Sequence, residues 1–139
     1  MISLIICTHG ALSTGLLDAA QMIFGDTKDC YALPLTPDLG FEEYRNQVAE
    51  LKERISETKR VVFLVDMYGA TPFNTALSTL TEELDALVIY GINLPLLLEL
   101  LALKSQSETA TDFLEKLEAT VIASQQSIGC SSVNQLLNG

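Results

Sequence analysis

The sequence predicts an α/β fold: a doubly wound, mainly parallel β-sheet with helices on both faces. Two features of the chain predict it. Short apolar runs rich in Ile, Val and Leu alternate with longer segments in which apolar residues recur every three or four positions. Turn-forming residues such as Gly, Asn and Pro stand near the junctions. Since right-handed crossovers join parallel strands through helices, this alternation places helices on both faces of one sheet.

The strands are expected at four short apolar runs, residues 2–8, 30–35, 61–65 and 86–90. The first and third runs are rich in Ile or Val and apolar at most positions, which is typical of parallel strands buried on both faces. Helices are expected over residues 11–24, 41–57, 93–103 and 109–124, and the third of these is very apolar. In the first of these helices, Leu12, Leu16, Ala20 and Ile23 recur at helical spacing, and Gly25 marks its end.

Two further segments are a helix expected near Thr71 and a tail after Ser127. Thr71 is a suitable N-cap for a further helix, and Pro72 fits the first helical position. The buried stripe of this helix is expected to comprise Phe73, Ala76, Leu77 and Leu80. The tail, residues 127–139, is ambiguous, and residues 128–136 fit a short extended segment at the edge of the sheet.

Composition narrows the classes of function. The 139 residues include 8 Lys and Arg against 18 Asp and Glu, a formal net charge of −10. This acid excess argues against nucleic-acid binding and docking on anionic membranes, and favours a basic protein partner. The three cysteines form no CxxC pair, so we expect no zinc site or disulfide framework and a reducing cytoplasm as the compartment. The length fits one domain, residues 1–139, and no run reaches the ~20 apolar residues of a membrane-spanning helix.

Polar residues follow the predicted strands where parallel sheets bind ligands, beyond the carboxyl ends. His9 follows the first strand, Asp66 the third, and Asn93 the fourth. A lone histidine is most often structural, and a strand-end aspartate often caps a turn. At this edge, however, an imidazole can act as a nucleophile toward phosphorus, and a carboxylate can fix its tautomer. The N–H groups of the following helices, near Gly10 and Thr71, favour an anion such as phosphate.

Three blocks of the sequence carry a resemblance to a known family. Thr8-His9-Gly10 is similar to the active-site motif of the mannose-family IIA domain of the bacterial phosphoenolpyruvate-dependent sugar phosphotransferase system. FLVDMYGATPFN (residues 63–74) and GINLPLLLE (91–99) resemble the second and third signatures of that family. The order and spacing of the blocks fit over essentially the whole chain. The family often has Trp at the position of Tyr68 and Gly-Ser at Ala70-Thr71, replacements that keep the aromatic and hydroxyl character.

The resemblance implies a role for each site residue. His9 carries the phosphoryl group on Nε2, and Asp66 is hydrogen-bonded to Nδ1. Gly10, Thr71 and Phe73 are expected to bind phosphoryl oxygens. Tyr68 and Asn93 are candidates for partner contacts, although ordinary packing and helix capping would also explain them. No cofactor or metal is expected, because one histidine and scattered carboxylates do not form a ligand set.

The same resemblance implies the partners. HPr, the histidine-containing carrier protein, would phosphorylate His9, and a IIB subunit would receive the group during sugar uptake. Contact with the membrane would be indirect, through IIC and IID. The family is usually dimeric and exchanges a C-terminal strand between subunits, which would give the tail a role. An acidic surface near His9 would steer a basic face of HPr, although the sequence does not place Glu42, Glu43 and their helix relative to His9.

Three other functions fit the fold class. The phosphoryl-carrier subunit of dihydroxyacetone kinase is a close relative, but residues 68–74 look more like the sugar-transport branch. A receiver-like domain phosphorylated on Asp66 would need an acidic pair after the first strand and a lysine at a later strand end. The chain has Thr8-His9 there, and its only later lysines are Lys104 and Lys116. A binding module without catalysis would not need His9 and Asp66. The sequence does not indicate which sugar is transported.

Overall fold

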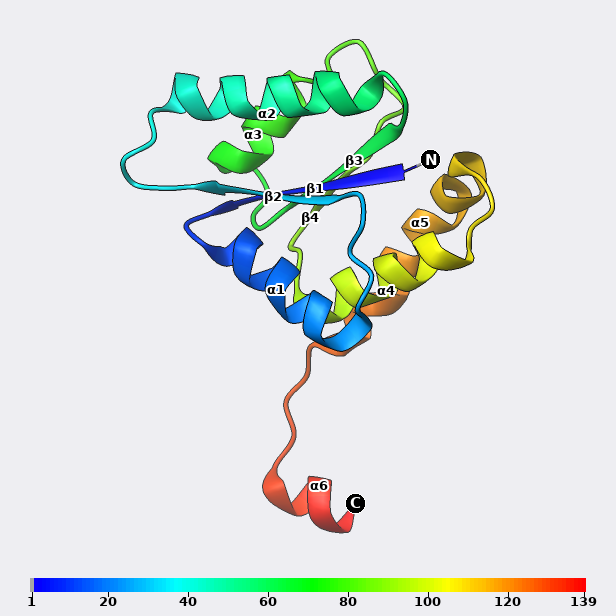
Figure 1. The fold of residues 1–139 in the computed structure, drawn as a ribbon. Coiled ribbons are helices and arrows are strands. Elements are labelled where there is room, and N and C mark those ends of the chain that lie inside the picture. The colour runs from blue at the N-terminus through cyan, green and yellow to red at the C-terminus, as the bar shows by residue number, and fades with distance from the viewer. Residues whose placement is uncertain (1) are drawn as a thin grey trace.

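The computed structural model describes residues 2–139 and confirms the predicted α/β class. A sheet of four parallel strands, in the order β2-β1-β3-β4, carries helices on both faces (Figure 1). The strands are β1 Ile2–His9, β2 Cys30–Leu35, β3 Arg60–Val65 and β4 Val88–Tyr90. The helices are α1 Leu12–Phe24, α2 Phe41–Ser56, α3 Thr71–Ser78, α4 Leu94–Gln106, α5 Ala110–Ser124, the 3-10 turn η1 Gln125–Ser127 and α6 Val133–Asn138.

The connections explain where the layers lie. From β1 the chain passes through α1 to β2 on one side, then through α2 back across β1 to β3 and β4 on the other side. The strand order therefore reverses between β1 and β3. Helices α2 and α3 cover one face of the sheet, whereas α1, α4 and α5 cover the other (Figure 1).

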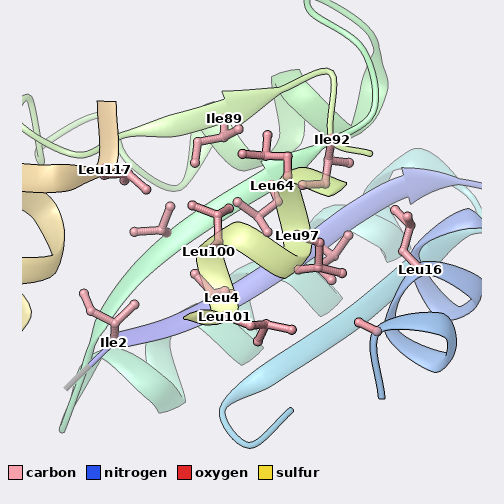
Figure 2. Packing of buried hydrophobic residues seen from close by; sticks show 14 of the residues in the cluster. Ile2, Leu4, Leu16, Leu64, Ile89, Ile92, Leu97, Leu100, Leu101 and Leu117 are labelled. Atoms are coloured by element: carbon pink, nitrogen blue, oxygen red, sulfur yellow. The ribbon is translucent and has the colours of Figure 1, made fainter. Parts of the chain in front are cut away.

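Both faces of β1 are buried because its side chains alternate between two apolar clusters. Leu4 and Ile6 pack toward α1, α4 and α5, and Ile5 and Cys7 pack toward α2 and α3. Figure 2 shows the first cluster, in which Leu97, Leu100 and Leu101 of α4 lie over the central strands. The continuous apolar run at the N-terminus was therefore a correct signal of a central strand.

Several details differ from the sequence-based expectation. Ala70 occupies the N-cap position of α3, so Thr71 is its first helical residue and the prediction of Thr71 as N-cap is wrong. Pro72 fits either of the first two helical positions, because neither N–H has a partner within the helix. Leu77, expected in the buried stripe, is 49% exposed, and Leu12 and Ile23 of α1 are also exposed.

The tail differs most from the prediction. The expectation of an extended edge segment over residues 128–136 is wrong for this chain, since residues 128–132 join no strand and α6 begins at Val133. Ser132 and Gln135 form a capping box that starts this helix. Figure 1 shows the tail extending away from the sheet and its helices. Its apolar side chains Ile128, Val133, Leu136 and Leu137 are all more than 70% exposed.

Across residues 2–139, the helices are each too short or too polar to cross a membrane.

An ion-pair cluster lies at the amino edge of the sheet. Asp29 precedes β2 in the left-handed conformation, with φ of 64°, and its backbone carbonyl accepts a hydrogen bond from the Leu4 N–H. Its carboxylate pairs with Lys59 and lies 3.7 Å from Lys104 Nζ. Burial pushes the pKa of Asp29 upward, but the hydrogen bond and charge of Lys59, with the charge of Lys104, outweigh burial and lower it.

We expect Asp29→Asn to reduce stability in a pH-dependent way. Asn tolerates the left-handed conformation, so the change removes mainly the charge. Because the folded-state pKa lies below the ordinary value of 3.8, the stabilisation is present above that value and is lost as pH falls through the folded pKa. Urea unfolding should show a deficit of roughly 1 kcal/mol near pH 7 that fades in strong acid. Asp18→Asn, an exposed control on α1, should show no such trend, and a pH-independent deficit for Asp29→Asn would contradict the assignment.

Candidate functional site

His9 is the last residue of β1 and lies at the carboxyl edge of the sheet. Its side chain is 48% exposed, while the seven preceding residues of the strand are buried. Gly10 turns the chain away with φ of 55°, a left-handed conformation that glycine adopts without strain. The Gly10 N–H donates to the Leu35 carbonyl at 2.7 Å, which anchors this turn to β2. The imidazole is thus held on a rigid strand but open to an approaching molecule.

Asp66 follows β3 and meets His9 where the strand order reverses. Because β1 and β3 are paired, with Cys7 opposite Val65, the residues after these strand ends come together. Asp66 Oδ2 lies 2.8 Å from His9 Nδ1 and also accepts the His9 backbone N–H at 2.9 Å. Asp66 Oδ1 accepts the Met67 N–H at 3.0 Å. The predicted pairing of these two residues, 57 positions apart, is present in the structure.

These contacts define the chemistry available to the His9 ring. A carboxylate that accepts two backbone N–H groups is an acceptor toward the ring as well, so Nδ1 carries the hydrogen. The lone pair then resides on Nε2, on the opposite side of the ring from Asp66. A neutral imidazole of this tautomer is a nucleophile, and positive charge that develops on it faces the Asp66 carboxylate. Asp66 itself is only 11% exposed and is not open to an external reagent.

The start of α3 offers free donors beside this pair. No side chain within residues 2–139 caps α3, whereas Asn93 caps α4 by accepting the Leu96 N–H at 2.9 Å. The first-turn N–H groups of Thr71 and Phe73 therefore lack helical partners, and Pro72 has no N–H. Gly69, with φ of 76°, turns the preceding loop, and the Asn74 amide donates to its carbonyl at 3.0 Å. Such a helix start suits an anion.

Of the other predicted residues, Tyr68 lies exposed at this edge, whereas Asn93 has a structural role. Tyr68 is 71% exposed on the loop after Asp66 and is accessible to a partner. Asn93 caps α4 and donates to Ser127 Oγ at 3.3 Å, which is the structural alternative that the sequence left open. Sequence reasoning missed Tyr90, whose ring contacts Tyr68. The available signal was its position directly before Gly91, at the end of the fourth strand.

Two potential nucleophiles beneath the site are held neutral. Cys7 is fully buried, and burial raises the pKa of its thiol to about 12. Burial also raises the pKa of Tyr44, whose hydroxyl donates to the Leu33 carbonyl at 2.7 Å. Neither group ionises near neutral pH, so His9 is the exposed nucleophile of this edge.

Acidic side chains lie on the same edge as His9. Figure 1 shows that the loop after β2 leads into α2 at the carboxyl edge. Glu42 and Glu43 lie in the first turn of α2, and His9 is paired with Leu35 at the end of β2, so these acids lie at the same edge as His9. Glu53 and Glu57 lie toward the other end of α2, near the edge that holds Lys59 and Lys104. The structure thus supplies the placement of this helix that the sequence could not.

Comparisons with known proteins agree with this arrangement. A family model described as "EIIA-man: PTS system fructose IIA component" matches residues 3–118. The "PTS system fructose-specific EIIA component" of Bacillus subtilis is 36% identical over 127 residues, covering 91% of this chain and 84% of the relative. The "PTS system mannose-specific EIIAB component" of Escherichia coli K12 is 35% identical over 72% of this chain, which spans only 31% of that longer relative.

A solved structure shows the same fold. It is the "PTS IIA protein associated with the fucose utilization operon" of Streptococcus pneumoniae, with a TM-score of 0.80 and 28% sequence identity. The alignment covers 99% of this chain and 96% of that one. The likeness therefore includes the sheet, the helices and the edge that holds His9 and Asp66.

We expect Asp66→Asn to change the tautomer of the neutral His9 ring. In the unchanged protein, nitrogen-15 NMR should show the hydrogen on Nδ1 and the lone pair on Nε2. An amide can donate as well as accept, so the variant should populate the Nε2–H tautomer. Asp38→Asn removes an acid from the neighbouring loop and should leave the tautomer unchanged. A lone pair on Nδ1 in the unchanged protein would contradict the geometry.

Proposed function

The chain belongs to the EIIA-man family of PTS system fructose IIA components, and on that premise we propose that it is a phosphocarrier acting through His9. It accepts a phosphoryl group from phospho-HPr and passes it to a IIB subunit during sugar uptake. The observation that carries the proposal is the 2.8 Å contact between His9 Nδ1 and Asp66 on a half-exposed ring, whose Nε2 has no hydrogen-bond partner among residues 2–139. The proposal places the chain in the cytoplasm, with the membrane reached through IIC and IID.

The first transfer exchanges one nitrogen–phosphorus bond for another. The Nε2 lone pair of His9 attacks phosphorus in line, the bond between phosphorus and the donor's imidazole breaks, and the donor ring keeps that electron pair. The hydrogen on Nδ1 stays in its bond to Asp66, whose carboxylate stabilises the positive charge that develops on the His9 ring. In the second transfer, the accepting group of IIB attacks the phosphorus and the bond between phosphorus and His9 Nε2 breaks. His9 is then the leaving group and keeps the electron pair.

Positioning and charge stabilisation dominate phosphoryl transfer, and the surrounding backbone is suited to both. We assign Thr71 and Phe73 to the phosphoryl oxygens. The same expectation for Gly10 does not hold, because its one donor, the backbone N–H, already donates to the Leu35 carbonyl. The Thr71 and Phe73 N–H groups lie in the uncapped first turn of α3. Thr71 also has a side-chain hydroxyl. Because this hydroxyl does not cap α3, it is available to bind phosphate.

The alternatives receive less support. All the curated relatives described above carry phosphotransferase-system names, which favours sugar transport over the dihydroxyacetone kinase carrier. A receiver-like function would require phosphorylation of Asp66, but both oxygens of that carboxylate already accept hydrogen bonds and the side chain is 11% exposed. Phosphorylation by acetyl phosphate that depends on Mg²⁺ and Asp66 would favour the receiver.

We further propose that the chain is a homodimer in which the tails are exchanged. In the described residues, β4 pairs only with β3, so its outer edge presents unpaired backbone groups. A cavity of about 300 Å³ runs beside that edge and is lined by apolar side chains that include Ile89, Leu117 and Val121. The exposed apolar side chains of the tail, Leu136 and Leu137 among them, have the chemistry to cover such a groove in a second copy.

The phosphocarrier proposal predicts a histidine-linked phosphate. Incubation with phosphoenolpyruvate, Enzyme I and HPr should label the protein with phosphate that is acid-labile and base-stable. His9→Ala should abolish the label, because it removes the accepting nitrogen. The matched control, Cys130→Ala, changes an exposed tail residue and should be labelled normally. Label that persists in His9→Ala would overturn the assignment.

The dimer proposal predicts a change of mass in solution. Light scattering should give twice the chain mass for the full-length protein and a single chain mass after deletion of residues 128–139, because the deletion removes the apolar tail. Leu84→Ser changes another highly exposed apolar residue outside the tail and should leave the dimer intact. A monomeric full-length protein, or a dimer that survives the deletion, would exclude exchange of the tails.

A further inference from the structure

Tyr90 lies beside the site, and the mechanism above gives it no role. It is the last residue of β4 and pairs with Val65, the last residue of β3. Its neighbour Ile89 packs on the α1, α4 and α5 face, whereas Val88 packs against the α2 and α3 cluster. Because side chains alternate along a strand, the Tyr90 ring emerges on the α3 side, level with the residue that precedes Asp66.

The Tyr90 ring joins a cluster of three aromatic rings. Its centroid lies 5.1 Å from that of Tyr68 in an edge-to-face arrangement, and 6.3 Å from that of Phe73. The rings of Tyr68 and Phe73 are 4.8 Å apart. All three separations lie in the range typical of aromatic pairs, and both pairs that involve Tyr90 have the preferred edge-to-face arrangement. A short strand therefore supports two rings that belong to one loop and the helix that follows it.

The loop in question carries the chemistry of the site. It begins with Asp66, which orients His9, and ends in the uncapped first turn of α3, where Thr71 lies. Its middle, residues 67–69, is exposed. The Asp66 carboxylate holds one end of the loop, and Asn74 holds Gly69 at the other. The Tyr68 ring lies between them and rests on Phe73 and Tyr90, so the rings supply the loop's apolar support.

We propose that Tyr90 is a positioning residue, which acts through Tyr68 and Phe73 to hold residues 66–73 in the conformation that receives the phosphoryl group. The inference rests on the phosphocarrier function proposed above. In-line transfer depends on the alignment of His9 Nε2 with the α3 N–H groups, and small displacements of such groups slow the reaction strongly. Tyr90 touches no reacting atom, and its contribution is to the geometry of the loop.

The test separates the transfer rate from binding. Single-turnover phosphorylation by phospho-HPr at several HPr concentrations gives a maximal rate and a half-saturating concentration. Tyr90→Ala should lower the maximal rate on the order of tenfold while the half-saturating concentration stays within about twofold. Tyr90→Phe keeps the ring and should restore the rate. Phe24→Ala removes a partly exposed ring from the far end of α1 and should behave like the unchanged protein.

A second readout follows the loop directly. Amide chemical shifts and relaxation of residues 66–71 should show increased motion in Tyr90→Ala and not in Tyr90→Phe. Thermal melting checks that each variant is folded, and Tyr90→Leu, which keeps apolar bulk without a ring, serves if the Ala variant does not fold. The Leu variant should also show a reduced maximal rate.

Each other outcome has a distinct meaning. If the unchanged protein accepts no phosphate on His9, the proposed function itself fails. If it is phosphorylated and both Tyr90→Ala and Tyr90→Leu keep its maximal rate, the positioning role is wrong. An increase confined to the half-saturating concentration would also overturn it, because Tyr90 would then contact the partner protein instead of holding the loop.

Discussion

The contact between His9 and Asp66 is the interaction on which the site depends, and the order of the strands makes it possible. His9 ends β1 and Asp66 follows β3, and these two strands are neighbours only because the chain reverses direction across the sheet between them. The Asp66 carboxylate accepts the His9 backbone N–H as well as the ring hydrogen. It therefore fixes the strand end and the imidazole together, and the tautomer follows from the topology.

The helices differ in how their first turns are closed. Asn93 and Thr109 close the first turns of α4 and α5 with side-chain hydrogen bonds. The N-cap residues of α2 and α3, Gly40 and Ala70, make no such bond, and the start of α3 lies beside His9. A side-chain oxygen at that place would occupy N–H groups that are otherwise open to an anion. The absence of a cap costs some helix stability but keeps the donors free, which is a common compromise at binding sites.

Apolar periodicity and strand ends are local signals, so the sequence predicted the sheet and its two layers and placed His9 and Asp66 at one edge. The hydrogen bond between these two residues was expected from the family resemblance. It failed where long-range packing decides. Leu77 fits the apolar periodicity of its helix but is exposed. Periodicity shows which residues share one face of a helix, but not whether another helix or strand covers that face at each position. The tail forms α6 instead of an extended segment, since short apolar stretches do not distinguish the two. Tyr90 was missed because its ring contacts Tyr68 and Phe73, which are distant in sequence and are brought to it only by the fold.

The distribution of charge connects the fold to the order of events at the site. Lys59 and Lys104 are gathered around Asp29 at the amino edge, where their charge is partly neutralised by that carboxylate. The carboxyl edge carries Glu42 and Glu43 on the same side as His9. Since Glu53 and Glu57 lie toward the amino edge, the net charge of −10 is shared between the two edges, and Glu42 and Glu43 are the acids placed to attract a basic surface toward His9. Attraction of that kind would act before contact, whereas the aromatic contacts proposed to hold residues 66–73 would act after it. Under the phosphocarrier proposal, the two features would therefore serve separate steps, encounter and transfer.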